Sequence, residues 1–160
     1  MTVYHLAQIN IGRFAQPKDH PANADFMNAL DHVNALAEAS PGFVWRLTGA
    51  GNDAVDLEVG DDPHMAANMS VWESLEDLAA FAYRNTDHRA IMRRRKEWFE
   101  PMAVYMALWW IPAGEIPTLA EGLRRLEMLA ANGPTAEAFL FAQPFPAPGG
   151  AAVGPVLETC

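Results

Sequence analysis

The chain has 160 residues, 51% of them hydrophobic, and a formal net charge of -9 at pH 7. This length fits one domain that buries roughly 70% of its unfolded surface, so the fold needs neither disulfides nor a structural metal. A nucleic-acid binder requires a basic surface, and the acidic balance excludes that class. The single cysteine, Cys160, cannot form an internal disulfide, which fits a reducing compartment.

Targeting and membrane signals are the next features to check. The first residues, Met1-Thr-Val-Tyr-His5, show neither the basic segment nor the long apolar run of a signal peptide. No stretch approaches the roughly 18 apolar residues that a membrane-spanning helix needs. We therefore expect a cytoplasmic protein with no membrane partner.

Hydrophobic periodicity predicts the secondary structure. Strand segments alternate at every second residue or are continuously apolar, and helical segments repeat apolar residues three and four positions apart. Ser74 with Asp77, and Thr118 with Glu121, are spaced as capping boxes that begin two of the helices. The predicted strands are 3–11, 43–48, 66–73 and 103–111, and the predicted helices are 24–39, 75–84 and 119–131.

The order of these elements predicts an α+β fold of the ferredoxin-like type. We expect a four-stranded antiparallel sheet with helices 24–39 and 75–84 on one face. The stretch 104–111 is apolar on both sides, so the other face must also be covered. Helix 119–131 and an arm at 139–145 are one explanation for that cover. We favour a second copy of the sheet, which would close a barrel and give a homodimer.

The chain divides into one domain and a tail. Residues 1–146 carry all the predicted elements and form the single domain. Residues 147–160 are rich in Ala, Gly and Pro and have little to bury, so we expect them to be disordered. Between the second and third strands, residues 49–64 hold five acids and three glycines. Their spacing is not that of a calcium-binding EF-hand loop, which favours a solvated acidic loop.

A basic segment follows the helix at 75–84. Six of the eleven Lys and Arg residues lie between Arg84 and Lys96. The spacing of apolar residues there predicts a second short helix with most of its charges outward. One interpretation is a solvated face paired with acids elsewhere. The other is that one or two of these arginines hold an anionic group in a pocket, because a guanidinium suits a carboxylate.

Polar residues interrupt the apolar strands in two places. Asn68, Ser70 and Trp72 share one face of the third strand, where they could orient a flat ligand or form a satisfied polar pair under a core Trp. Arg46 lies in a largely apolar strand, and its guanidinium needs an acceptor there, either an acid such as Glu73 or a ligand.

His88 is the catalytic candidate. An imidazole could act as a general base near neutral pH or bind haem iron, and alternatively it could cap the preceding helix or pair with a carboxylate. The remaining histidines show no spacing typical of a metal site, so we expect none. We predict a pocket in which the ligand contacts are Arg46, Asn68, Ser70, Trp72 and Tyr83.

Five segments carry a resemblance to a known family. They are Tyr4-His-Leu-Ala-Gln-Ile-Asn10, Pro41-Gly-Phe-Val-Trp-Arg46, Asn68-Met-Ser-Val-Trp-Glu-Ser74, Met92-Arg-Arg-Arg-Lys-Glu-Trp-Phe99 and Leu108-Trp-Trp-Ile-Pro-Ala-Gly114. As a set they resemble a bacterial domain-of-unknown-function family, DUF3291, of the dimeric α+β barrel superfamily. The resemblance runs from Tyr4 to about Pro148. It implies the fold and a homodimer, and it implies no reaction.

The superfamily widens the range of functions that the resemblance implies. It includes cofactor-independent monooxygenases acting on polyketide-like aromatics, haem-binding enzymes and simple stress-related domains. Trp72-Glu-Ser74, Phe81-Ala-Tyr83 and His88 with the arginines after it are also similar to a short stretch of haem-dependent carotenoid monooxygenases. The resemblance therefore implies haem as one candidate cofactor.

Two functions follow as hypotheses. The first is a monooxygenase-like enzyme that acts on a hydrophobic or aromatic small molecule, with or without haem. The second is a small-ligand-binding or structural module that catalyses nothing.

Overall fold

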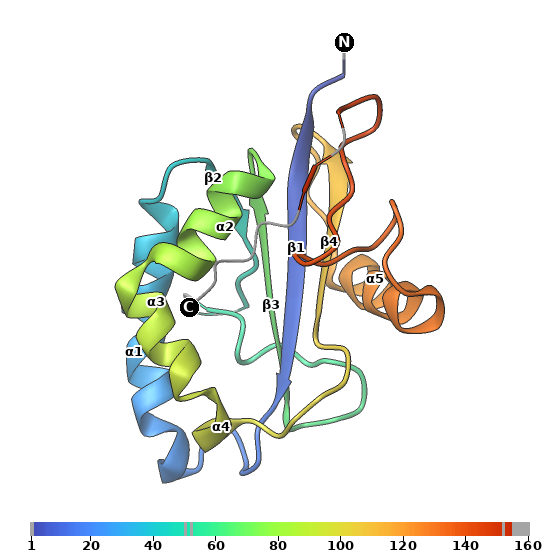
Figure 1. Ribbon diagram of the computed structural model, residues 1–160. Helices are drawn as coiled ribbons and strands as arrows, with labels where there is room; N and C mark the ends of the chain where they lie inside the picture. The colour runs from blue at the N-terminus through green and yellow to red at the C-terminus, as the bar shows by residue number, and fades with distance from the viewer. Residues whose placement is uncertain (1, 50, 52, 152, 155–160) are drawn as a thin grey trace.

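The computed structural model describes residues 2–49, 51, 53–151, 153 and 154. Its strands form one antiparallel sheet in the order β2-β3-β1-β4, which confirms the predicted α+β, ferredoxin-like arrangement (Figure 1). The elements are β1 (Tyr4–Arg13), η1 (Pro21–Asn23), α1 (Ala24–Glu38), β2 (Phe43–Arg46), β3 (Met65–Trp72), α2 (Leu75–Arg84), α3 (Thr86–Arg93), α4 (Arg95–Trp98), β4 (Met106–Pro112) and α5 (Leu119–Asn132).

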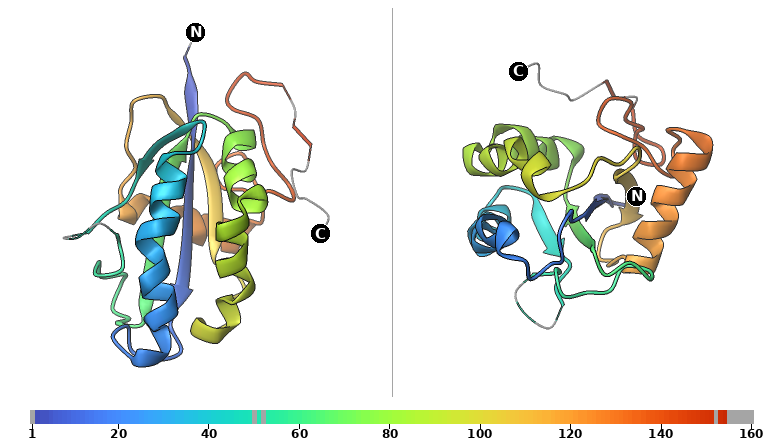
Figure 2. Two further views of the ribbon diagram at one scale, coloured as in Figure 1. Left: turned by 90° about the vertical axis from the view of Figure 1, so that its left-hand side faces the viewer. Right: turned by 90° about the horizontal axis from the view of Figure 1, so that it is seen from below.

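Helices cover both faces of this sheet. Helices α1, α2 and α3 lie on one face, as predicted for the first two, and α5 lies on the other (Figure 2). Ser74 caps α2 by accepting a hydrogen bond from the Asp77 N–H, and Thr118 caps α5 by accepting one from the Glu121 N–H, both at 3.1 Å. None of the helices in the described part of the chain is both long and apolar enough to cross a membrane.

The sheet face predicted to lie bare is covered within the chain itself. Helix α5 packs on β1 and β4, and Val59 from the loop before β3 joins the same core. A Cβ at Gly122 would lie 2.7 Å from Ile9 Cδ1, so glycine allows α5 to approach the sheet. Ile9, Met69 and Trp109 have 0% of their surface exposed. Because α5 supplies the cover assigned to a second sheet, the homodimer stays a prediction that needs another source of support.

Some predicted boundaries change. The basic segment forms two helices, α3 and α4, because the chain leaves helical geometry at Arg94. Strand β4 begins at Met106 rather than near residue 103. The predicted arm pairs with the outer edge of β4 through Phe139 alone, whose N–H and C=O both bond to Leu108 at 2.9 Å.

The predicted tail lies partly outside the described residues. In 147–160, the structure describes 147–151, 153 and 154, and residues 152 and 155–160 lie outside it. The Gly150 N–H donates to the Ala147 carbonyl at 2.7 Å, and Val153 packs against the core on the α2 side of the sheet. The disorder of the remaining tail stays a prediction.

Candidate functional site: a cavity between the sheet and its helical layer

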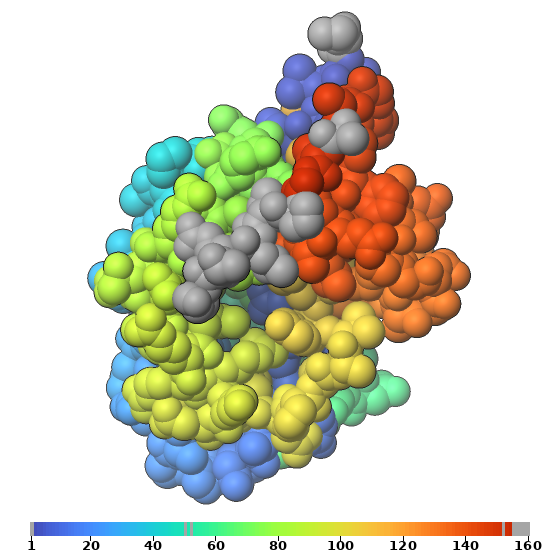
Figure 3. All heavy atoms as spheres, viewed as in Figure 1, coloured from blue at the N-terminus to red at the C-terminus, as the bar shows by residue number. Residues whose placement is uncertain are grey.

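A cavity lies between the sheet and the layer of α1, α2 and α3. Its volume is ≈ 500 Å³, which is typical of a small-molecule site. Atoms of β1 (dark blue) are visible at the bottom of a hollow between the α3–α4 segment and the residues that precede β4 (Figure 3). All six site residues predicted from the sequence line this cavity: Arg46, Asn68, Ser70, Trp72, Tyr83 and His88. The structure therefore brings them together, and their roles stay predictions.

The wall of the cavity is largely apolar. Helix α1 contributes Phe26, Leu30 and Val33, and α2 contributes Phe81 and Ala82. These side chains belong to apolar helix faces, yet all five residues are only partly buried. They face the cavity instead of a close-packed sheet, so the layer leaves apolar surface for a hydrophobic guest.

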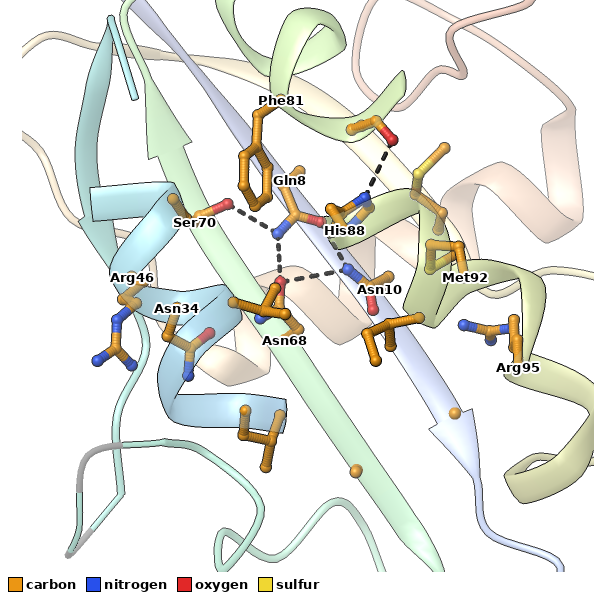
Figure 4. A pocket seen from close by; sticks show the side chains of 18 of the residues that line it. Gln8, Asn10, Asn34, Arg46, Asn68, Ser70, Phe81, His88, Met92 and Arg95 are labelled. Atoms are coloured by element: carbon orange, nitrogen blue, oxygen red, sulfur yellow. Dashed lines mark hydrogen bonds between the residues drawn. The ribbon is translucent and has the colours of Figure 1, made fainter. Parts of the chain in front are cut away.

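The floor of the cavity is polar, and we call Gln8, Asn10, Asn68 and Ser70 the polar floor. The register of β1 and β3 places Gln8 opposite Ser70 and Asn10 opposite Asn68. Gln8 Nε2 donates to Asn68 Oδ1 at 2.7 Å and to Ser70 Oγ at 2.8 Å (Figure 4). Asn10 Nδ2 donates to Gln8 Oε1 at 3.1 Å and to Asn68 Oδ1 at 3.2 Å. These bonds fix the four side chains relative to one another.

Some hydrogen-bonding groups around the floor remain without a protein partner. Within the described part of the chain, the two hydrogens of Asn68 Nδ2 and the Asn10 Oδ1 acceptor make no hydrogen bond. The amide of Asn34, a buried residue of α1, makes none either, and in Figure 4 it lies close to Asn68. Asn68 is an exposed residue and Asn10 is partly buried, so solvent reaches both, whereas Asn34 is buried, and buried polar groups in proteins are nearly always paired. Solvent or a ligand must therefore satisfy these donors and acceptors.

His88 takes the capping role that the sequence left open, and its catalytic role stays a prediction. Its Nδ1 lies 3.0 Å from the Ala82 carbonyl oxygen, so the imidazole caps the last turn of α2. Since a carbonyl can only accept, Nδ1 carries the proton and Nε2 keeps a free lone pair. Burial lowers the His88 pKa below its ordinary value of 6.5, and the Ala82 bond opposes this only partly. The side chain is thus a neutral base at neutral pH.

The contacts of Ser70 and Trp72 are mainly with other residues of the cavity wall and floor. Trp72 is 1% exposed, and its ring stacks on Phe81 with centroids 5.5 Å apart. Its indole N–H donates to Ser70 Oγ at 2.9 Å, which also accepts from Gln8. Trp72 therefore has no free polar group, and Ser70 acts mainly by holding Gln8 in the floor.

Arg46 pairs with an acid, one of the two kinds of acceptor expected, and that acid is Glu38. Its Nε lies 3.0 Å from Glu38 Oε1, at the end of α1, and not beside Glu73. Glu73, named as an example of such an acid, is not the partner in this ion pair, because Glu38 comes from the neighbouring helix, whose position the strand pattern does not contain. The Arg46 side chain is 9% exposed and forms part of the wall beside the polar floor.

Tyr83 stands at the boundary between the cavity and the arm. Its ring meets Phe141 edge to face, with centroids 5.2 Å apart. Burial raises the pKa of its phenol, so Tyr83 stays protonated. It can offer a ligand a neutral hydroxyl.

The arginines of the basic segment divide between the two interpretations given above. Arg94 pairs with Asp25 and Glu97 at 2.8 Å, as expected of a solvated face. Arg95 turns inward, lines the cavity and donates to the Ile11 carbonyl at 3.2 Å.

Sequence reasoning missed Asn34, Gln8 and Asn10. Asn34 lies four residues after Leu30 on the apolar stripe of α1, and a polar residue in such a stripe is the signal that could have found it. Gln8 lies on the same strand face as buried Leu6, so alternation already placed a buried amide there.

The implied haem fits this cavity in one respect. A ligating histidine normally donates its other ring N–H to a carbonyl or carboxylate, as His88 does to Ala82. Haem would supply dioxygen activation when bound, and His88 would be the residue holding it. Among the described residues, no group of three His, Cys, Asp or Glu could hold a metal ion by itself.

A family model described as "Domain of unknown function (DUF3291)" matches residues 5–154. The chain belongs to the DUF3291 family. The match includes the whole sheet except the first residue of β1, all the helices and the polar floor. None of the curated proteins matches this DUF3291 chain in sequence.

Several solved structures are similar to the DUF3291 chain at low identity. NE2512, a protein of unknown function from Nitrosomonas europaea, is 14% identical, with 74% of this chain and 99% of that one covered and a TM-score of 0.47. A conserved protein from Methanosarcina mazei Go1 is 10% identical, with 68% and 92% covered and a TM-score of 0.49. SnoaB, a cofactor-independent oxygenase from Streptomyces nogalater, is 14% identical, with 70% and 95% covered and a TM-score of 0.46.

Proposed function

We propose that this protein binds a flat hydrophobic or aromatic small molecule in the cavity and oxygenates it in a monooxygenase-like reaction. The observation that carries the proposal is a set of polar groups in a largely apolar cavity that bond to no described residue: Asn68 Nδ2, the Asn34 amide and His88 Nε2. Sparse polar groups in an apolar wall are how small-molecule sites fix orientation. The apolar wall would hold the ring system, and the amides would bond to its oxygens.

The chemistry begins with proton transfer. A ketone with an acidic CH₂ would lose a proton from that carbon to His88 Nε2, and the N–H groups of Asn68 would stabilise the resulting enolate oxygen. The carbanion can reduce dioxygen by one electron, and recombination of the two radicals with return of the proton gives a hydroperoxide. Loss of water then leaves a carbonyl. Substrate CH₂ plus O₂ thus becomes C=O plus H₂O, with no further reductant.

The second candidate is a binding module that uses the same cavity without turnover. The polar floor favours neither candidate, because a ligand oxygen needs the same hydrogen bonds whether or not it reacts. His88 separates them. A binding module needs no neutral base beside its ligand, whereas proton abstraction does.

The test measures oxygen uptake with a panel of flat ketones that carry an acidic CH₂, such as anthrone. We expect wild-type protein to consume oxygen above the spontaneous rate, and His88→Gln to lose at least about a hundredfold of that rate, the size typical of a general base. Equal rates in the two proteins would overturn the base assignment. Ligand binding without turnover across the whole panel would overturn the enzyme proposal and favour the binding module.

An absorption spectrum of the purified protein distinguishes a haem-dependent reaction from the cofactor-independent one. A Soret band, or a shift on adding hemin that disappears in His88→Ala, would replace the cofactor-independent reaction with a haem enzyme. Hemin that gives no shift, or the same shift in His88→Ala, would exclude His88 as its ligand.

A further inference from the structure

Arg95 is one of three arginines of the basic segment that line the cavity, and its guanidinium donates to the backbone of β1. Going along α3 and into α4, His88, Met92 and Arg95 follow one another on the side that faces the polar floor (Figure 4). Burial lowers the pKa of the Arg95 guanidinium, which nonetheless stays charged near neutral pH. A cation therefore stands in the same apolar cavity as the proposed base.

Among the described residues, Arg95 makes no ion pair with an acid. In the described part of the chain its polar partner is the Ile11 carbonyl at 3.2 Å, and no carboxylate lies within ion-pair distance. Arg13, Arg94 and Arg125 each pair with Glu or Asp at 3.1 Å or less. The chain has 20 Asp and Glu residues for 11 Lys and Arg. A half-buried guanidinium without an Asp or Glu partner costs folding free energy unless another anion pairs with it.

Two aromatic rings help to hold Arg95 in place. Its guanidinium lies over the Tyr105 ring at 4.7 Å and over the Phe99 ring at 5.3 Å. Phe99 itself lies against β1 at Gly12, where a Cβ would come within 2.6 Å of its ring. The planar group therefore contacts two aromatic rings, with N–H groups left over for a ligand. Such fixed positioning favours recognition over a merely solvated charge.

We infer that Arg95 recognises an anionic group of the ligand, so the substrate class is a flat hydrophobic acid rather than a neutral hydrocarbon. This inference rests on the proposed small-molecule cavity and adds the chemistry of its guest. Arg89 and Arg93 line the same side and would draw an anion towards the cavity despite the net charge of -9. The acid group would lie at Arg95 and the remaining oxygens at the polar floor.

The experiment compares two fluorescent probes that share one ring system. Anilinonaphthalene sulfonate carries an anion, and phenylnaphthylamine lacks it. We expect Arg95→Met to weaken sulfonate binding at least about tenfold, because a charge-assisted bond is lost, and to change phenylnaphthylamine binding less than about twofold. Met keeps an unbranched side chain of similar length without the charge. Lys96→Met is the matched control, since Lys96 is exposed, lies outside the cavity and loses the same charge.

The outcomes separate the two proposals. If neither probe binds wild-type protein, or if filling the cavity with Ala29→Trp in a folded variant leaves both affinities intact, the small-molecule cavity is wrong. If both probes bind in the cavity but Arg95→Met and Lys96→Met weaken the sulfonate equally, the anion site at Arg95 is wrong and the cavity stands. Circular dichroism and thermal melting of each variant show that it is folded.

Discussion

His88 Nδ1 and the Ala82 carbonyl oxygen are 3.0 Å apart, and this one bond links the end of α2 to the proposed chemistry. It satisfies a carbonyl at the end of a helix, where intrahelical partners run out. It also decides which ring nitrogen carries the proton, so that Nε2 is the basic one. A residue that caps a helix in this way can be structural and reactive at once.

His88 also makes stability depend on pH. Its folded pKa is lower than its ordinary value of 6.5, so the unfolded chain binds the proton more readily. The folded state therefore loses stability as pH falls from about 6.5 towards the folded pKa, by at most about 1.4 kcal/mol per pH unit. We expect urea unfolding at about pH 7.5 and about pH 5.5 to show a larger loss for wild type than for His88→Gln. Parallel losses would show that His88 titrates normally.

Ser70 is the key acceptor beneath the polar floor. Its Oγ accepts from Gln8 at 2.8 Å and from the Trp72 indole at 2.9 Å. Ser70→Ala leaves the Trp72 indole N–H unpaired and removes one of the two bonds that Gln8 Nε2 donates, and we expect it to lower the free energy of unfolding by about 2 kcal/mol in urea. Thr86→Ala, at an exposed position of α3, is the control and should change the free energy of unfolding by less than about 0.5 kcal/mol. A similarly small effect at Ser70 would mean that water replaces its oxygen.

We expect the Asn34 side chain to lower the stability of the fold and to contribute to ligand binding. Its amide has no partner in the described part of the chain, and it interrupts the apolar face of α1. We expect Asn34→Leu to raise the free energy of unfolding by about 1 kcal/mol, since Leu favours helices and buries apolar surface. Asn28→Leu, on the exposed side of the same helix, should raise the free energy of unfolding by only about a few tenths of a kcal/mol.

Ligand affinity decides whether Asn34 is functional. With an oxygen-bearing ligand identified from the flat-ketone panel, Asn34→Leu should weaken binding about fivefold or more, while Asn28→Leu should leave it unchanged. A variant that is more stable and binds as tightly would show that the amide is a structural imperfection and no part of the site.

The homodimer can be tested directly in solution. Light scattering coupled to size exclusion at micromolar concentration should give twice the chain mass of 17.6 kDa. Since α5 covers the second sheet face, such a dimer would have to use another surface, and its interface should bury more than about 1,000 Å². A mass of one chain would show that α5 completes the fold alone.

Much of this protein follows from local pattern in the sequence. Periodicities of two and of three to four residues predict the four strands and three longer helices, because side-chain direction depends only on backbone geometry. Alternation alone places Asn68, Ser70 and Trp72 on one face of β3. The capping pattern at Ser74 predicts where α2 begins, since the Ser oxygen bonds to an N–H three residues away.

Only the tertiary structure decides which distant groups meet. Whether α5 or a second chain covers the sheet depends on how closely Gly122 lets that helix approach, and no periodicity expresses that distance. Arg46 reaches Glu38 because α1 ends beside β2, whereas Arg95 lines the cavity and makes no ion pair with a described acid. The sequence shows that charged and polar groups are present among apolar residues. Their partners are set by packing between elements, and packing is what leaves the cavity with polar groups unpaired.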